Sequence, residues 1–263
     1  MVIRCFALCL SLNSTKLHDI EVFIIDTEVC KSWKSHWFFC GIANALSLIT
    51  LILCLGVALP AFGMWFYYWQ YDVNNTYAVV NMEPEDLHEV TRHMIRYMQG
   101  ELDNREHGLQ IETVVGGQVR YFFSDIEIRH MVDVYDLVVV GLLVRNIAIL
   151  LLVLTSVAFA VWGRNYVKYL LKSWQYVTAS IFALLTTLVL VISINWHRAW
   201  HIFHEIFFDN DYWILDPQVD LLINIVPYQF FFTMSVFIGA FFAGGLIILF
   251  FVSVILQRKL NHQ

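Results

Sequence analysis

The sequence predicts an all-α membrane protein with four transmembrane helices and a small extracytoplasmic α+β cap. The 263-residue chain is 59% apolar and 14% charged, and its mean hydropathy is +0.63, which is typical of a membrane protein. A helix needs about 20 predominantly apolar residues to cross a hydrocarbon core of roughly 30 Å. Four apolar runs meet this requirement, and we place the spans at 36–69, 137–163, 174–195 and 229–257.

The basic residues predict how the spans are oriented. Cytoplasmic loops next to spans are enriched in Lys and Arg, and the loop 164–173 carries three basic residues and no acidic one. Basic residues also precede the first span and follow the last. We therefore expect the extension 1–35 and the tail 258–263 to be cytoplasmic. The segments 70–136 and 196–228 are then expected to lie outside the cytoplasm.

The charge distribution indicates which class of partner the chain does not suit. The two external segments hold eighteen of the twenty-two acidic residues, and the chain has a net charge of −6. This excess of negative charge argues against nucleic acid as a partner. All five cysteines lie at or before residue 54. The external segments are therefore expected to contain neither a structural disulfide nor a thiolate metal site.

The larger external segment has the pattern of a folded cap. Apolar residues recur at helical spacing between a proline and a glycine, which predicts a helix over 84–98. Two short runs, 110–115 and 118–123, flank the pair Gly116-Gly117. This arrangement predicts a β-hairpin with a tight turn.

The start of the second span carries a cluster of ionisable side chains. Ser124 and Glu127 have the Ser-x-x-Glu spacing of a capping box, which predicts the start of a helix that continues into the span. His130 is then placed at the outer interface, with Glu127 and Asp133 one turn away on either side. Both carboxylates are candidates to orient its ring, as a carboxylate does in a Ser-His-Asp triad. The alternative interpretation is that these three side chains form an ordinary solvated cluster at the start of a helix, where carboxylates are favourable.

A second group of histidines lies between the third and fourth spans. His197, His201 and His204 recur at spacings of four and three in an aromatic-rich stretch, which predicts an interfacial helix over 196–208. The polar face of such a helix is a sufficient explanation of His197 and His201. His204 lies deepest in the segment, beside Glu205 and before an acidic turn. Because the outer ends of neighbouring spans are close in a four-helix bundle, we expect His204 to converge on the histidine of the second span.

Aromatic and basic side chains near the outer interface are candidates to bind a lipid-like substrate. Acyl chains need an apolar groove, and the residues that we expect to line it are Trp65, Phe66, Tyr67, Phe203, Phe207 and Phe230. An ordinary aromatic belt at the interface explains the same residues. Arg145 lies about two turns inside the second span, where a charge is costly. It is a candidate to bind a polar headgroup, and snorkelling to the interface is the alternative.

Two of these stretches resemble a known family. "SDIEIRHMVDV" before a span and "FHEIFFDNDYWILDPQVDLLINIVP" between two later spans look like the lipoprotein intramolecular transacylase family (Lit), small four-span membrane enzymes with an external cap. The resemblance covers roughly residues 38–256 and leaves 1–35 outside. Tyr135 and Tyr228 depart from the family pattern, in which a basic and an acidic residue are more usual. Neither departure is at the position of His130 or His204.

The resemblance implies an intramolecular acyl transfer. In this family the sn-2 acyl chain of a diacylglyceryl-modified N-terminal cysteine moves to the α-amine of that cysteine, giving an N-acyl, lyso-form lipoprotein. The two active-site histidines fall on His130 and His204, and neither a metal nor another cofactor is implied. The implied partners are diacylglyceryl-modified bacterial lipoproteins and membrane lipid. The oligomeric state is not indicated.

Histidine side chains suit such a reaction. An ammonium with an ordinary pKa of about 8 must lose a proton before it attacks an ester, and the departing glycerol alkoxide must gain one. Histidine, with an ordinary pKa of about 6.5, does either near neutrality. The chain has no G-x-S-x-G motif and no external cysteine, which favours direct aminolysis over an acyl-enzyme. The sequence leaves open which histidine is the base.

Two other function classes use the same residues. Glu127-x-x-His130 and His201-x-x-His204-Glu205 on facing helices are of the types that ligate a metal, as in a metal-dependent membrane hydrolase. A non-enzymatic membrane subunit that senses pH through its external histidines is the other class. The hydrolase needs the full set of ligands, whereas the transacylase needs only the two histidines.

Overall fold

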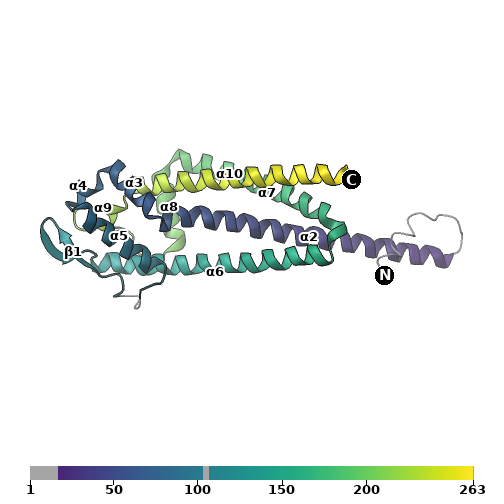
Figure 1. Ribbon diagram of the computed structural model, residues 1–263, viewed down its shortest axis with the longest axis horizontal. Helices are drawn as coiled ribbons and strands as arrows, with labels where there is room; N and C mark the ends of the chain where they lie inside the picture. Colours follow the sequence, from purple (N-terminus) through teal and green to yellow (C-terminus); the bar gives the residue numbers. More distant parts are fainter. Residues whose placement is uncertain (1–16, 103–106, 263) are drawn as a thin grey trace. The chain divides into compact units, whose positions relative to one another are not determined.

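The computed structural model describes residues 17–102 and 107–262 (Figure 1). Of the predicted extension, residues 1–16 lie outside the described residues and the rest continues into the first helix. The predicted class is confirmed, because one two-stranded sheet interrupts an otherwise helical chain in the described part. In chain order the elements are α2 (Leu17–Phe62), α3 (Met64–Asn74), α4 (Thr76–Val80), α5 (Pro84–Met98), β1 (Glu112–Val115), β2 (Gln118–Tyr121), α6 (Asp125–Val161), η1 (Arg164–Tyr166), α7 (Val167–Ile194), α8 (Trp196–Phe207), α9 (Leu222–Ile225) and α10 (Tyr228–Asn261).

Four helices among the described residues are long and apolar enough to cross a membrane, as predicted. They cover Ser35–Phe62, Asp125–Val161, Val167–Ile192 and Tyr228–Asn261. The first predicted span extends too far, because its helix ends at Phe62 and a new one begins at Met64. Gly63 between them has an extended backbone, and a Cβ there would overlap the carbonyl oxygen of Leu59. Hydropathy does not detect this break, since Gly63 lies inside an apolar run.

Helix α6 is longer than a bilayer requires. Its 37 residues correspond to about 55 Å at 1.5 Å per residue, against a hydrocarbon core of roughly 30 Å. The charged residues of α6 from Asp125 to Asp136 all lie in its first turns, before the apolar run that starts at 137. We therefore expect these turns to extend beyond the hydrocarbon, with His130 near the membrane surface.

The chain divides into two compact units. The first comprises the described parts of 1–48, 149–181 and 247–263, and the second comprises the described parts of 49–148 and 182–246. The elements of the cap and both predicted active-site histidines belong to the second unit. The candidate site is therefore contained within one unit.

Polar side chains join the helices of the first unit. Asn44 is 1% exposed, and its Nδ2 donates to the hydroxyls of Thr155 at 2.9 Å and Ser156 at 3.1 Å. Its Oδ1 accepts from Nε1 of Trp174 at 3.0 Å. Because lipid removes most of the hydrophobic drive for helices to associate, hydrogen bonds and close packing take its place. Asn44 thus joins α2 to α6 and to α7.

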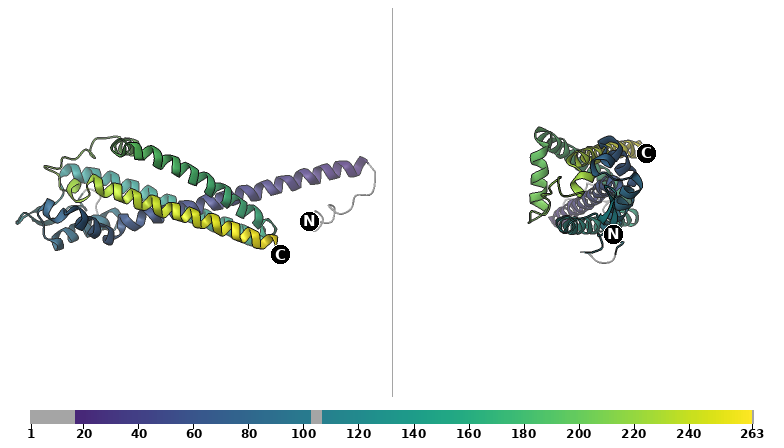
Figure 2. Two further views of the ribbon diagram at one scale, coloured as in Figure 1. Left: turned by 90° about the horizontal axis from the view of Figure 1, so that it is seen from above. Right: turned by 90° about the vertical axis from the view of Figure 1, so that its left-hand side faces the viewer.

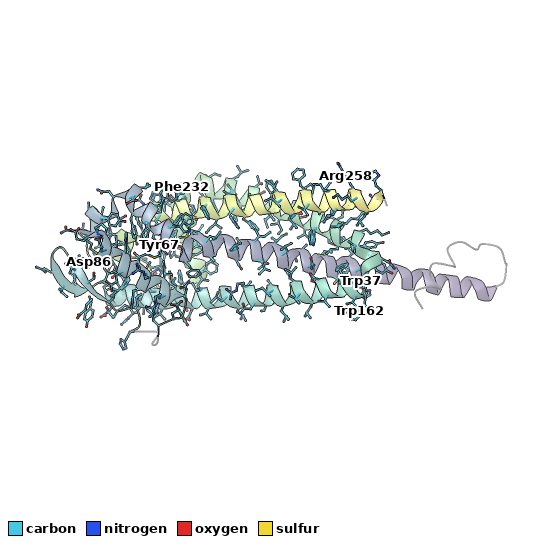
Figure 3. All side chains as sticks on the ribbon, viewed as in Figure 1. Trp37, Tyr67, Asp86, Trp162, Phe232 and Arg258 are labelled. Carbon is cyan, nitrogen blue, oxygen red and sulfur yellow. The ribbon has the colours of Figure 1, made fainter. Side chains whose placement is uncertain are left out.

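The second unit has an apolar core of its own. Helices α3, α4 and α5 pack around it with α9 and the hairpin, and the three blue helices lie together in both views of Figure 2. Its largest fully buried apolar side chains include Tyr71, Phe66, Phe122, Phe230 and Leu87. Tyr67, labelled in Figure 3, belongs to the same core. Burying one such side chain stabilises the fold by roughly 1.5–3 kcal/mol relative to exposing it.

The predicted cap elements are confirmed, with shorter strands. The predicted helix over 84–98 is α5. Strands β1 and β2 pair antiparallel with Val115 opposite Gln118, and each ends two residues short of its predicted outer end. Gly116 and Gly117 have φ of +59° and +76°, which a type I′ turn requires and glycine readily adopts.

Candidate active site

The predicted capping box fixes the start of α6. The N–H of Ser124 donates to Oε2 of Glu127 at 2.6 Å, and the N–H of Glu127 donates to Oγ of Ser124 at 3.5 Å. The other carboxylate oxygen of Glu127 accepts from the N–H of Leu222, at the start of α9. Glu127 is 1% exposed. Its carboxylate therefore holds α9 against the start of α6 and does not orient His130 as predicted.

Asp133 also forms its hydrogen bond with a loop and not with His130. Its Oδ2 accepts from Nδ2 of Asn210 at 2.9 Å. Nδ1 of His130 is buried without a hydrogen-bond partner in the part of the chain that the structure describes. The predicted carboxylate–imidazole bond is thus not formed by Asp133, because the carboxylate is directed toward the chain that follows α8.

The two predicted histidines converge. The ring centroids of His130 on α6 and His204 on α8 lie 6.2 Å apart, with their planes inclined by 35°. Phe208 contacts both rings, with centroids 5.4 Å from His130 and 5.6 Å from His204. A substrate group placed between the rings would therefore meet two imidazoles in apolar surroundings.

The tautomer of His204 follows from its hydrogen bond. Its Nδ1 lies 2.8 Å from the carbonyl oxygen of Trp200, one turn earlier on α8. A carbonyl only accepts, so Nδ1 carries the proton and Nε2 of the neutral ring has a free lone pair. Burial lowers the pKa of His204, and the nearby His201 lowers it further, against the opposing effect of the Trp200 carbonyl. The neutral form therefore predominates near neutrality.

Aromatic rings surround His204. Trp213 stacks on it, with centroids 4.6 Å apart and planes at 28°, and Trp200 meets it edge-on at 4.3 Å. Phe203 contacts it at 5.4 Å. The imidazole is 5% exposed. Its orientation is thus set by one backbone hydrogen bond and by packing on several sides.

The predicted substrate-binding residues separate into two groups. Phe203 and Phe207 contact each other at 4.8 Å beside His204, are 42% and 51% exposed, and stay candidates for an acyl-binding surface. Trp65, 49% exposed, and the buried Tyr67 belong to the part of the cap around α3, where the Tyr67 hydroxyl donates to the carbonyl of Ala61 at 3.0 Å. Neither of these two has a ring contact with the histidine pair among the described residues.

Arg145 lies away from the pair. Its guanidinium is exposed and donates to the side chain of Asn146 at 3.1 and 3.2 Å. It follows His130 by fifteen positions on the same helix, which corresponds to about 22 Å. A headgroup role for Arg145 therefore requires a ligand that extends well along α6.

The residues of the metal-site alternative do not assemble. Among the described residues, no group of three or more His, Cys, Asp or Glu side chains is arranged to hold a metal ion. Glu127, which that site would need, is instead bonded to two backbone N–H groups. His201 packs against Trp213 with centroids 5.2 Å apart. This donor set therefore disfavours the hydrolase alternative.

Asn210 and Trp213 contact the site but were not singled out by sequence patterns. Asn210 is 77 positions from its partner Asp133, and Trp213 stacks on a histidine of another element. No spacing rule applies to contacts of this kind. The only signal in the sequence is that both belong to the short acidic turn immediately after the His204 helix.

The comparison with family models and the comparison with solved structures agree with each other. The sequence model of the family "Lipoprotein intramolecular transacylase Lit" matches residues 42–231. The fold is similar to that of the membrane integral lipoprotein intramolecular transacylase Lit from Bacillus cereus, with a TM-score of 0.73 and 23% identity, over 87% of this chain and 99% of that one. A variant of that protein with a histidine replaced by arginine has a TM-score of 0.71 and 22% identity, over 90% of this chain and 98% of its own. No curated protein sequence matches the chain.

Proposed function

The chain belongs to the lipoprotein intramolecular transacylase family, and we propose that it moves the sn-2 acyl chain of a diacylglyceryl-cysteine lipoprotein to the α-amine of the same cysteine. It is a multi-pass membrane protein, as its four spans and its fold relatives indicate. The observation that carries the proposal is the His130–His204 pair, whose ring centroids lie 6.2 Å apart. We place the pair at the membrane surface, where both reacting groups of a lipid-anchored substrate would lie.

His204 is the general base in this proposal. The free lone pair on its Nε2 removes a proton from the α-amine as the nitrogen attacks the ester carbonyl. A C–N bond forms, and the bond between the carbonyl carbon and the sn-2 oxygen of glycerol breaks. The hydrogen bond of Nδ1 to the Trp200 carbonyl keeps the lone pair on Nε2 and stabilises the imidazolium that forms.

His130 is the general acid. Buried N–H groups without an acceptor are rarer than buried acceptors without a donor, so we place its proton on Nε2 and the lone pair on the unpartnered Nδ1. Nε2–H then stabilises the developing oxyanion and protonates the departing alkoxide. A proton from the amine thus ends on the glycerol hydroxyl once the pair has exchanged protons.

The remaining barrier reduction comes from proximity. Amine and ester belong to one molecule, and well-oriented intramolecular reactions reach effective molarities of roughly 10⁵–10⁸ M. No serine or cysteine nucleophile is then needed. Phe203 and Phe207 would contact the acyl chains, while the exposed Trp65 and Arg145 would contact more distant parts of the lipid, and the buried Tyr67 supports the cap beside Trp65. Glu127 and Asp133 support the pair through the segments that they hold.

The orientation completes the proposal. The loop between α6 and α7 carries basic residues, whereas the segments around the histidine pair are acidic. We therefore place both termini in the cytoplasm and the site at the extracytoplasmic surface of the cell membrane, where lipoproteins carry their lipid. No cofactor enters the reaction.

Mass spectrometry of a model lipoprotein tests the function. The protein and its His130→Ala and His204→Ala variants are expressed in a host that otherwise makes only the diacylglyceryl form, and the N-terminal peptide is analysed. We expect unchanged total acyl mass with one chain moved to the amine, and a loss of at least 10²-fold, roughly the general acid–base contribution, in each variant. Loss of acyl mass would identify a hydrolase instead, and an unchanged peptide would favour the pH-sensing subunit.

A further inference from the structure

The loop after α8 is fastened to α6 on both sides of His130. The amide of Asn210 donates to Asp133, three positions after the histidine, at 2.9 Å. The guanidinium of Arg129, one position before it, lies 5.5 Å from the ring centroid of Tyr212. Two independent contacts therefore hold this loop at the turn of α6 that carries His130.

The same loop also contacts the second histidine. Trp213 stacks on the ring of His204 at 4.6 Å. Asn210 defines the shape of the loop as well, because its Oδ1 accepts from the N–H of Tyr212 at 3.0 Å. One short segment, residues 209–213, thus links the helix of one histidine to the ring of the other.

The two histidine helices have few other links. Among the described residues, α6 and α8 share little direct backbone contact. The 6.2 Å separation of the rings therefore depends on what joins the helices at their ends. Reacting groups misplaced by about 1 Å can lose on the order of 10² in rate, so a link at this point controls the chemistry.

We propose that Asn210 is a positioning residue, whose bond to Asp133 sets loop 209–213 so that Trp213 holds His204 against His130. It touches neither the substrate nor the reacting atoms. This inference rests on the proposed acyl transfer and adds the residues that set the geometry of the pair.

The first test is Asn210→Asp. The substitution keeps the size of the side chain and the oxygen that accepts from Tyr212, but it replaces the donated hydrogen bond with two facing carboxylates. We expect kcat to fall on the order of 10- to 100-fold, with KM nearly unchanged because the acyl-binding surface is intact. The rate is measured on purified protein with a synthetic diacylglyceryl-cysteine lipopeptide in mixed micelles.

Two double variants separate the bond from the added charge. In Asp133→Asn with Asn210→Asp, the direction of the hydrogen bond is reversed, and kcat should recover to within about threefold of the unchanged protein, since the contact is restored. In Asp211→Asn with Asn210→Asp, the net charge of the loop is restored but the bond is not. The side chain of Asp211 is exposed, so Asp211→Asn alone should retain full activity and this second pair should remain slow.

The outcomes distinguish the two proposals. If the unchanged protein transfers no acyl chain to the amine, the proposed function fails. If it does, but Asn210→Asp is equally fast or the reversed pair does not recover, the positioning role is overturned. If Asn210→Asp does not fold, Trp213→Leu decides, because it removes the stacking on His204 and leaves Asp133 untouched. It should lower kcat by a similar factor, and unchanged kcat would refute the inference.

Discussion

Among the described residues, the interior of the first unit contains at least as many polar side chains as apolar ones, whereas the second unit has a continuous apolar core. Buried polar residues of the first unit are Asn44, Ser47, Ser173, Thr178 and Ser253. Many of its large apolar side chains are exposed, and Leu150 for example is 58% exposed. The core of the second unit runs from α3 and α5 to the start of α10. The difference lies in the cap elements α3, α4, α5, α9 and the hairpin, which belong to the second unit and lie outside the four candidate spans. Water drives apolar burial and lipid does not.

The second unit buries polar side chains both in the cap, at Gln70, Thr76 and Thr91, and around the site. Glu127, His204 and Asp220 are buried polar residues there, and they belong to the segments that hold the histidine pair. Asp220 accepts from the hydroxyl of Ser124 at 3.0 Å, next to the capping box of α6. Apolar packing therefore forms the core of this unit, and the buried polar groups near the histidine pair define the geometry of the site.

Truncation of a leucine should have its largest effect in the second unit. Leu87 on α5 is fully buried, so Leu87→Ala should lower the free energy of unfolding by about 2–5 kcal/mol. The same change at Leu150, in the first unit, should alter it by less than about 0.5 kcal/mol because that side chain is already exposed. Denaturant unfolding in detergent, followed by circular dichroism, measures both. Equal losses would contradict the contrast between the units.

Loss of a polar side chain should matter in the first unit, by a smaller amount. Asn44→Ala removes three hydrogen bonds, and bonds between membrane helices contribute about 0.6 kcal/mol on average, so a loss of about 1–2 kcal/mol is expected. Thr155→Val removes one of the partners at nearly constant volume. In a double-mutant cycle of unfolding free energies the two changes should be less than additive. Strict additivity would show that the bond is not formed.

Acid should destabilise the second unit by the smallest amount. The folded-state pKa of His204 is lowered by burial, so between that value and the ordinary value of about 6.5 the unfolded chain binds the extra proton. Stability is therefore complete above about pH 6.5 and decreases as the pH falls, by about 1.4 kcal/mol for each unit of pKa lowering. His204→Asn keeps a donor for the Trp200 carbonyl without a titrating ring. Unfolding between pH 7.5 and 5.5 should depend less on pH in this variant, and an unchanged dependence would assign the effect to other groups.

Sequence patterns predict the parts of this protein that are local in the chain. The spans, the capping box at Ser124, the turn at Gly116-Gly117 and helix α5 each follow from residues within a few positions of one another. The convergence of His130 and His204 was predictable as well, because two short connections leave few ways to arrange neighbouring spans.

The remaining features depend on contacts that no local pattern describes. The break at Gly63 lies inside an apolar run, and the carboxylate of Asp133 selects an amide 77 positions away rather than the histidine one turn away. Glu127 was predicted to orient His130 because the two share a helix face, yet burial next to Leu222 gave it backbone partners. Tertiary packing determines these hydrogen-bond partners, so they can be identified only in the folded chain.

The continuity of α6 has a mechanical consequence. From Asp125 to Val161 the helix has no interruption, so the segment anchored in the lipid and the turn that carries His130 move as a rigid rod. A displacement of that rod along its axis changes the depth of the imidazole by the same distance. Helices adjust to bilayer thickness by tilting or shifting. We therefore expect the thickness of the surrounding membrane to change the depth of the His130 imidazole, because the lipid-facing segment and the histidine belong to one uninterrupted helix.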